Sequence, residues 1–309
     1  MDPSMIAGIA AGIGLIIFGI GFGNLTAFLS LQGAVIVVGG TFAALVASFP
    51  SVALKKVPKQ IEIAFKGTIM EPGLYIEQIS DCAKVARKHG MLALEQLAHA
   101  QEDEFMRDSM LQIIDTMDSH KIRAMLEAEL IFLEERHLEG VTFFERGASF
   151  APAFGLVGTI IGLILMLTNL GLDDVDAERT LTNGMAIALI TTFYGSLLSN
   201  LFFSPIASKL QATHDREMLC KRIIIEGMIS IQAGENPKFI REKLISFLPQ
   251  SERRAMQAKT QESGKPGGSA ADGVFSEEDS EEDVAISHKR KTGIAGIFSK
   301  YVKKKKTTT

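Results

Sequence analysis

The four longest apolar runs of this 309-residue chain contain no Asp, Glu, Lys, Arg or His: Met5–Gly23, Leu31–Phe49, Phe150–Leu172 and Leu181–Phe203. Each run has about 20 residues, enough for a helix to cross the ~30 Å hydrocarbon core of a bilayer. A membrane protein that moves ions usually keeps an ionisable group at membrane depth as its binding site. Either this chain conducts nothing, or a partner chain supplies that group.

Signatures of catalysis and of metal binding are also missing from the sequence. It has no Gly-rich phosphate loop after a strand, no His/Cys cluster and no HExxH pattern. The two cysteines, Cys82 and Cys220, have no metal-ligand spacing, and we interpret them as unreactive buried thiols. Five histidines lie in charged, helical sequence and are expected on the solvated surface: His89, His99, His120, His137 and His214. We therefore predict no enzymatic activity, no metal site, no cofactor and no nucleic-acid partner.

Basic residues predict the orientation of the chain in the membrane. They follow the second and fourth apolar runs: Lys55, Lys56, Lys59, Lys209 and Arg216. The loop 24–30 has no basic residue, and the loop 173–180 has four acidic residues against Arg179 alone. By the positive-inside rule, both termini and the large central segment are expected in the cytoplasm. The first run has no basic residues before it, so we expect a retained helix rather than a cleaved signal peptide.

The predicted fold is an all-α integral membrane protein with four transmembrane helices and a large helical cytoplasmic domain between the second and third. Apolar residues at helical spacing, with breaks at Pro72-Gly73 and His89-Gly90, predict several helices in the central segment. Residues Lys121–Phe144 read as one long helix that feeds the third span. The expected organisation is a helical hairpin at 1–50, a cytoplasmic domain at 51–148, the third and fourth spans at 149–204, cytoplasmic helices at 205–250, and a tail at 251–309.

Small residues form stripes along the predicted spans and indicate close packing of helix backbones. The stripes are Gly8/Gly12, Gly19/Gly23, Gly40/Ala44/Ser48, Gly155/Gly158/Thr159/Gly162, and Gly184/Ala188/Thr191/Thr192/Gly195/Ser199. In the last two spans this small face should meet another helix or a narrow polar path, while the Leu/Ile/Phe face meets lipid or the hairpin. Pro152 permits a kink and frees a backbone carbonyl. Pro205 is expected to end the fourth span at its inner edge.

The hydroxyls of Thr159, Thr191 and Thr192 have two interpretations. Threonines in membrane helices often donate to the carbonyl of their own preceding turn, which would give them no further role. Alternatively, one or two of them line an ion path together with the carbonyls freed near Pro152. Oxygen ligands suit a hard cation. Hydroxyls cannot balance its charge, so a carboxylate must come from elsewhere.

The run from Arg87 to Glu95 carries a mixed cluster of charges, with more acids just beyond it. Such charges usually form a solvated helix face. On a domain that projects from a membrane, they could instead be a docking surface on which complementary charge orients a partner.

These features together make the chain resemble the MotA/PomA family of flagellar stator proteins. The resemblance rests on four spans with a central loop of about 100 residues, the stretch AFGLVGTIIGLILML, the stretch MAIALITTFYGSLLSNLFFSPIASKL, and the basic residue followed eight positions on by Glu95. It covers about Met5–Leu248 and excludes the tail.

The resemblance implies partners and roles that the residues alone do not give. It implies a homopentamer in the bacterial inner membrane, around a dimer of a single-span MotB/PomB-type subunit that carries the ion-binding Asp. Pro152 and Pro205 match the two functional prolines of the family. Thr159 and Thr192 match positions implicated in sodium selection, and Arg87, Lys88 and Glu95 match residues that engage the rotor protein FliG. The transported cation could be Na⁺ or H⁺.

Two other functions stay open at this level. An ExbB/TolQ-type energiser of envelope transport shares the last two spans, but resembles a three-span arrangement without an N-terminal hairpin. A passive membrane scaffold would have the same threonines and conduct no ion.

The tail differs in composition from the rest of the chain. Gly, Ser, Lys and Glu dominate after Pro249, and residues 252–288, with an acidic run at 277–283, are predicted to be disordered. Near the end, Ile294, Ile297, Phe298 and Tyr301 share one helix face between basic clusters at 288–291 and 303–306. This segment is either disordered or an amphipathic helix on an anionic lipid surface.

Overall fold

The computed structural model describes residues 3–67, 70–115, 118–168 and 175–263, and in these residues it contains helices and no strand. The chain divides into two compact units, Met1–Ala258 and Lys259–Thr309, and every contact given below lies within the first. The acidic run and the amphipathic segment predicted for the tail lie outside the described residues. Of the loop 173–180 predicted between the third and fourth spans, residues 173 and 174 also lie outside them, whereas residues 175–180 are helical and not a loop.

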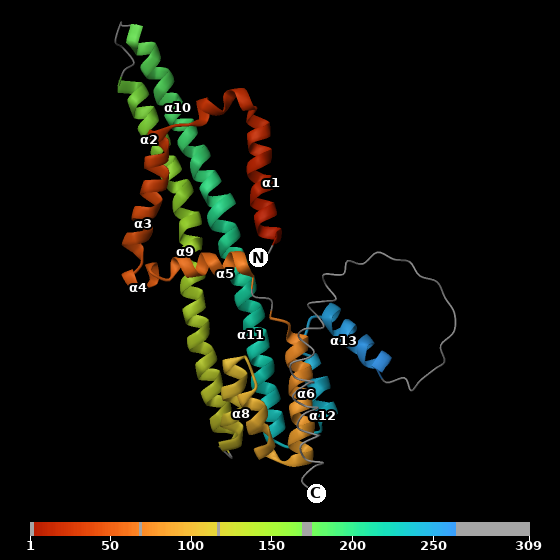
Figure 1. Cartoon of the computed structure of the whole chain (residues 1–309). Helices are drawn as coiled ribbons and strands as arrows, with labels where there is room; N and C mark the ends of the chain where they lie inside the picture. Colours follow the sequence, from red (N-terminus) through yellow and green to blue (C-terminus); the bar gives the residue numbers. More distant parts are fainter. Residues whose placement is uncertain (1–2, 68–69, 116–117, 169–174, 264–309) are drawn as a thin grey trace, which may run out of the picture. The chain divides into compact units, whose positions relative to one another are not determined.

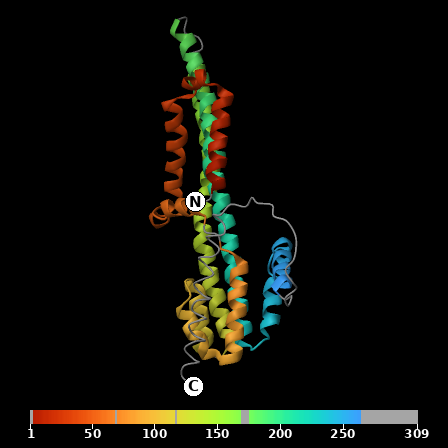
Figure 2. The same ribbon diagram turned by 45° about the vertical axis from the view of Figure 1, so that its right-hand side comes forward.

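Two long helical segments run side by side through the first unit (Figures 1 and 2). Helix α9 spans Ser119–Thr168 without interruption over 50 residues. The prediction that residues 121–144 form a helix feeding the third span is therefore confirmed. The second segment consists of α10 (Val175–Leu197), the π-helix η4 (Leu198–Phe203) and α11 (Ser204–Gln232).

The second long segment does not stop at Pro205. Proline has no N–H, so a regular α-helix would lose one backbone hydrogen bond at this position. The π-turn η4 comes directly before it, and π-turns inside helices are known places where the hydrogen-bond register changes. The helix then continues to Gln232, and the predicted break follows at Gly234, which has φ of +71°, before α12 begins at Pro237.

The first two spans do not form the expected hairpin. Helix α1 (Pro3–Ile20) contacts η4, whereas α3 (Gly40–Ser48), which follows α2 (Leu31–Ala34) and the π-helix η2 (Val35–Gly39), packs along α9. The chain leaves α1 at a 99° bend into the 3₁₀ helix η1 (Phe22–Phe28), which carries it across to α2 (Figure 1).

Three helical segments are long and apolar enough to cross a membrane: Leu31–Ser48, Ser119–Thr168 and Leu181–Gln232. The bent pair Ser4–Ile20 and Phe22–Phe28 is a fourth if it counts as one span. The described residues are thus consistent with the predicted four-span helical fold.

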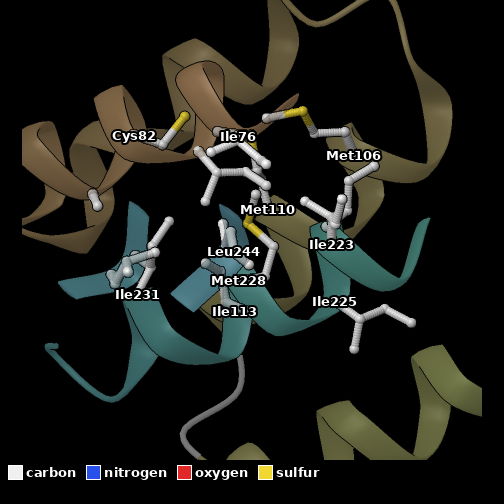
Figure 3. Close-up of a cluster of buried hydrophobic side chains, with 14 of the residues drawn as sticks. Ile76, Cys82, Met106, Met110, Ile113, Ile223, Ile225, Met228, Ile231 and Leu244 are labelled. Atoms are coloured by element: carbon white, nitrogen blue, oxygen red, sulfur yellow. The ribbon is translucent and has the colours of Figure 1, made fainter. Parts of the chain in front are cut away.

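Short helices surround the lower halves of α9 and α11: α4 (Ser51–Leu54), α5 (Val57–Lys66), α6 (Pro72–His89), η3 (Met91–Ala93), α7 (Leu94–His99), α8 (Glu104–Asp115) and α12 (Pro237–Ile245). The buried side chains of α6, α7, α8 and α12 form one apolar core with those of α9 and α11, in which residues of α6, α8, α11 and α12 face each other (Figure 3). Large side chains dominate this core, including Ile76, Met106, Met110, Ile223 and Met228. Helices α4 and α5 instead pack on a second apolar cluster nearer the spans, which includes Ala64, Phe144 and Phe203. Residue Gly90, with φ of +83°, makes the turn after α6, as the break predicted at His89-Gly90 requires.

The first part of the predicted disordered tail is helical. Helix α13 spans Gln250–Ser263, so the expectation of disorder does not hold for 252–263. Met256 is buried, close to Gly73 of α6, and Arg216 of α11 forms an ion pair with Glu252 at 3.2 Å. These contacts hold a segment whose composition alone suggested disorder.

Candidate functional site

The small faces of α9 and α10 meet each other directly. A Cβ atom placed on Gly158 would lie 2.5 Å from Cβ of Thr191, and one placed on Gly162 would lie 2.7 Å from the backbone nitrogen of Ala188. On α10, a Cβ placed on Gly195 would lie 2.6 Å from the carbonyl oxygen of Ala151. The two backbones approach too closely here for any side chain, so the predicted small-residue face meets a helix rather than open space.

The N-terminal stripes behave differently. Gly12 lies against Leu201, and Gly40 lies against the ring of Phe154, so both are close packing positions. Gly8, Gly19 and Gly23 have nothing within 4 Å of a placed Cβ. Within the described chain, the predicted packing role thus holds at two of these positions and not at the other three.

Hydroxyl and carbonyl oxygens gather between the two spans. The hydroxyl oxygens of Thr159 and Thr192 lie 2.6 Å apart, and they lie 3.1 and 3.3 Å from the carbonyl oxygen of Ala188. One of the two threonines donates to the other, which leaves a single proton for two carbonyls, that of Ala188 and that of Gly155, 3.1 Å from the Thr159 hydroxyl. Lone pairs therefore remain on a group of three neutral oxygens, with Thr192 exposed and Thr159 half-buried. Such a group can contribute ligands to a hard cation but no charge.

Thr191 contacts this group from its packed side, because its hydroxyl also lies 3.1 Å from the carbonyl oxygen of Ala188. Its side chain is fully buried against Gly158, and its hydroxyl is 2.9 Å from the Ile187 carbonyl of its own preceding turn. The local back-bonding interpretation fits Thr191, and Thr159 and Thr192 also have a carbonyl of their own preceding turn within reach, at 3.1 and 3.3 Å. The structure brings Thr159 and Thr192 together and places Thr191 on the packed side of them.

Pro152 lies within α9 and is exposed. Its missing N–H leaves the carbonyl of Ala148, four residues earlier, without a helical donor. The hydroxyl of Ser199 on η4 donates to that carbonyl at 2.7 Å. The freed carbonyl is thus already bonded within the chain, and Ser199, which the sequence had only placed on a small face, is the residue that satisfies it.

Tyr194 makes two hydrogen bonds that the sequence did not predict. Its hydroxyl donates to the Phe28 carbonyl and accepts the backbone N–H of Ser30 at 3.1 Å. It thereby joins the fourth span to the segment between the first two. A tyrosine inside an otherwise apolar run was the available signal, because a buried hydroxyl normally finds a partner.

Arg87, Lys88 and Glu95 lie at the turn where α6 ends and α7 begins. All three are exposed, and the described part of the chain offers none of them an ion-pair partner. Leu92, between them, is 76% exposed. This turn lies at the end of the helical bundle away from the apolar spans (Figure 1).

One of the five histidines, His214, is buried, contrary to the sequence prediction, and a second, His137, is half-buried. His137 of α9 and His214 of α11 face each other with their Nδ1 atoms 3.3 Å apart, and His214 is buried. Glu217 lies 4.0 Å from His137 and 3.6 Å from Lys221. Burial lowers the pKa of His137, with His214, Arg136 and Lys221 acting in the same direction and Glu217 opposing them. Their helical spacing gave no sign that the two helices bring them together.

The cysteines do lie where the sequence placed them. Both are free and buried. Burial raises the pKa of the Cys82 thiol to about 12 and that of Cys220 to about 11. Both thiols are therefore protonated and unreactive near neutral pH.

Comparisons with known proteins add to this geometry. Residues 97–223 match the MotA/TolQ/ExbB proton channel family. The chain is 39% identical over 251 residues to motility protein A of Aquifex aeolicus, covering 80% of this chain and 97% of that protein. It is 34% identical over 254 residues to chemotaxis protein PomA of Vibrio alginolyticus, covering 82% and 98%. The solved structure of MotAB from C. jejuni matches with a TM-score of 0.73 and 28% identity, over 81% of this chain and 97% of that one.

Proposed function

This chain belongs to the MotA family of flagellar stator proteins, within the MotA/TolQ/ExbB proton channel family, and we propose that its third and fourth spans form one wall of an ion path. The resemblance seen in the sequence is thereby confirmed. Members of this family convert ion flow into torque on the flagellar rotor and are not enzymes.

The observation that carries the proposal is the neutral oxygen group of Thr159, Thr192 and the Ala188 carbonyl. The apolar spans around it contain no Asp, Glu, Lys, Arg or His. A passing cation needs a counter-charge in a medium of low dielectric constant, and these oxygens provide none. The charge comes from the Asp of a MotB-type partner, whose neutralisation by the ion lets one subunit step past the other. Pro152 borders the path, and Thr191 supports it through packing.

The close contact of α9 and α10 supports a mechanical role. Their backbones touch at Gly162 and Gly195, and Gly158 packs against the side chain of Thr191, so the two helices move as one body. Ion entry on one side of that body can then displace the whole pair. Each elementary charge that crosses ~100 mV releases about 2.3 kcal/mol for such a movement. Pro205 and the preceding π-turn η4 form the point at which the pair enters the cytoplasm.

The assembly proposed is a homopentamer around a MotB-type dimer in the inner membrane, with both termini in the cytoplasm. The similar C. jejuni structure is that of a MotAB complex, and this likeness supports a MotB-type partner. The exposed charges Arg87, Lys88 and Glu95 form the surface that engages FliG. Complementary charge on a rotor protein would set orientation and encounter rate on this surface.

The test is motility rescue in a strain that lacks its own A-type stator subunit, with the MotB-type partner co-expressed. Thr159→Ala removes one oxygen of the group, and Thr159→Ser keeps it. For a sodium path, Thr159→Ala should raise the sodium concentration needed for half-maximal swimming speed about tenfold, as expected for the loss of one contact to a charged group. Thr159→Ser should stay near the wild type. Swimming that ignores sodium but stops with an uncoupler would assign the path to protons instead.

A further inference from the structure

A cavity of about 400 Å³ lies beside the inner end of the second apolar span. It is lined by Ser48, Phe49, Thr142, Arg146 and Phe150. The ring of Phe49 also packs edge to face against that of Phe143, which lies outside the cavity, with the ring centroids 5.3 Å apart. The cavity thus combines one cation and two hydroxyls with two aromatic rings.

The depth of this cavity follows from the sequence on both sides of it. Ser48 is the last residue of the apolar span Leu31–Ser48, and Lys55 and Lys56 follow within about two turns. Arg146 lies one helical turn before Phe150, where the apolar run of α9 begins. The cavity therefore opens at the boundary between hydrocarbon and the basic cytoplasmic surface.

The charge of Arg146 is available for a ligand. Its side chain is exposed, and the described residues place no carboxylate within ion-pair distance of it. The acid nearest in sequence, Glu145, points about 100° away around the helix. Glu139, further along the same helix, is held by Lys56 at 3.3 Å. Ser48 donates its proton to the Ala44 carbonyl at 2.7 Å, so its lone pairs and the Thr142 hydroxyl complete a polar face.

We propose that this cavity binds an anionic phospholipid of the inner leaflet, with the phosphate on Arg146 and Thr142 and an acyl chain along Phe150. A guanidinium group and a phosphate form paired, charge-assisted hydrogen bonds. The aromatic rings contact the apolar part of the same molecule, which a free anion would leave exposed to water. The site is separate from the proposed ion path and does not depend on it.

The test is native mass spectrometry of the full chain, purified and delipidated in mild detergent, then titrated with phosphatidylglycerol or phosphatidylcholine. The wild type should bind one phosphatidylglycerol per chain in preference to phosphatidylcholine. Arg146→Gln should weaken phosphatidylglycerol binding about tenfold, and Thr142→Val should weaken it by less. The matched control is Lys55→Gln, which removes a nearby exposed cation outside the cavity and should change binding by less than about twofold.

Three results would overturn the proposal. Equal losses in Arg146→Gln and Lys55→Gln would mean diffuse attraction to lipid charge. Displacement of the lipid by millimolar inorganic phosphate would mean a site for a free anion. Dissociation of the purified assembly in Arg146→Gln, with lipid binding per chain unchanged, would assign this face to contact with a second copy of the chain. The helix content of each variant, measured by circular dichroism, shows whether the variant has folded.

Discussion

The paired spans and the cytoplasmic bundle of this protein hold their helices together in opposite ways. Between α9 and α10, glycines bring the backbones into contact, and hydroxyls bond to carbonyls across the gap. Below, the same long helices are joined through large apolar side chains and through ion pairs, such as Glu226 with Arg123 at 2.9 Å and with Lys243 at 2.6 Å. One chain therefore changes its packing chemistry partway along two continuous helices.

The difference follows from the surroundings of each part. In lipid, helices gain no hydrophobic free energy from meeting, so close van der Waals contact and hydrogen bonds hold them. In water, burial of apolar surface contributes about 25 cal/mol per Å² and favours large side chains. Enlarging a residue should thus damage the spans, and truncating one should damage the bundle.

Ile223→Ala should have the largest effect on stability. Ile223 is fully buried in the core of the cytoplasmic bundle (Figure 3), and truncation of a buried isoleucine costs about 2–5 kcal/mol. Thermal unfolding of the full chain in detergent, followed by circular dichroism, should show a lowered midpoint. Ile131→Ala, at a position 55% exposed on α9, is the control and should change little. Equal effects of the two would mean that the bundle is not held by its core.

Gly162→Ala should have the next largest effect, and it should act on the spans. Its Cβ would meet backbone atoms of α10, which cannot move aside as a flexible side chain can, so we expect a cost of about 1–3 kcal/mol. The swimming speed of the rescued strain should fall because the packing of the two spans is destabilised. Gly19→Ala makes the same change where nothing lies within 4 Å and should leave swimming intact. Normal motility with Gly162→Ala would show that close backbone contact is not required.

The histidine pair should give the smallest effect, visible in the pH dependence of stability. Because burial lowers the pKa of His137 in the folded chain, its contribution is fully present above the unfolded pKa of about 6.5. It should be lost as the pH falls below that value, since the unfolded chain then takes up a proton that the folded chain resists. Denaturant midpoints measured between about pH 7.5 and 5 should fall less steeply in His137→Gln than in the wild type. The exposed His99→Gln is the control and should keep the wild-type slope.

The features predictable from the sequence were those carried by a single helix. The uncharged runs, the long helix through residues 121–144 and the small faces around Gly158 and Gly195 all follow from composition and period. The features that depend on which helix meets which were not predictable. The hairpin, the surface position of His214 and the disorder at 252–263 were wrong because tertiary contacts decided them. The hydrogen bond from the Ser199 hydroxyl to the Ala148 carbonyl was also not predictable, because it joins two different helices.

Helix α9 is uninterrupted, so a rotation at one of its ends is transmitted to the other. Its 50 residues extend ~75 Å at about 1.5 Å per residue, from the apolar span to the far end of the cytoplasmic bundle. Because no break separates the two ends, a pivot of about 5° at the upper end would displace the lower end by about 6 Å, on the order of one helical turn. Movements of this protein that are slight near the ion would become large where the charged turn meets its target.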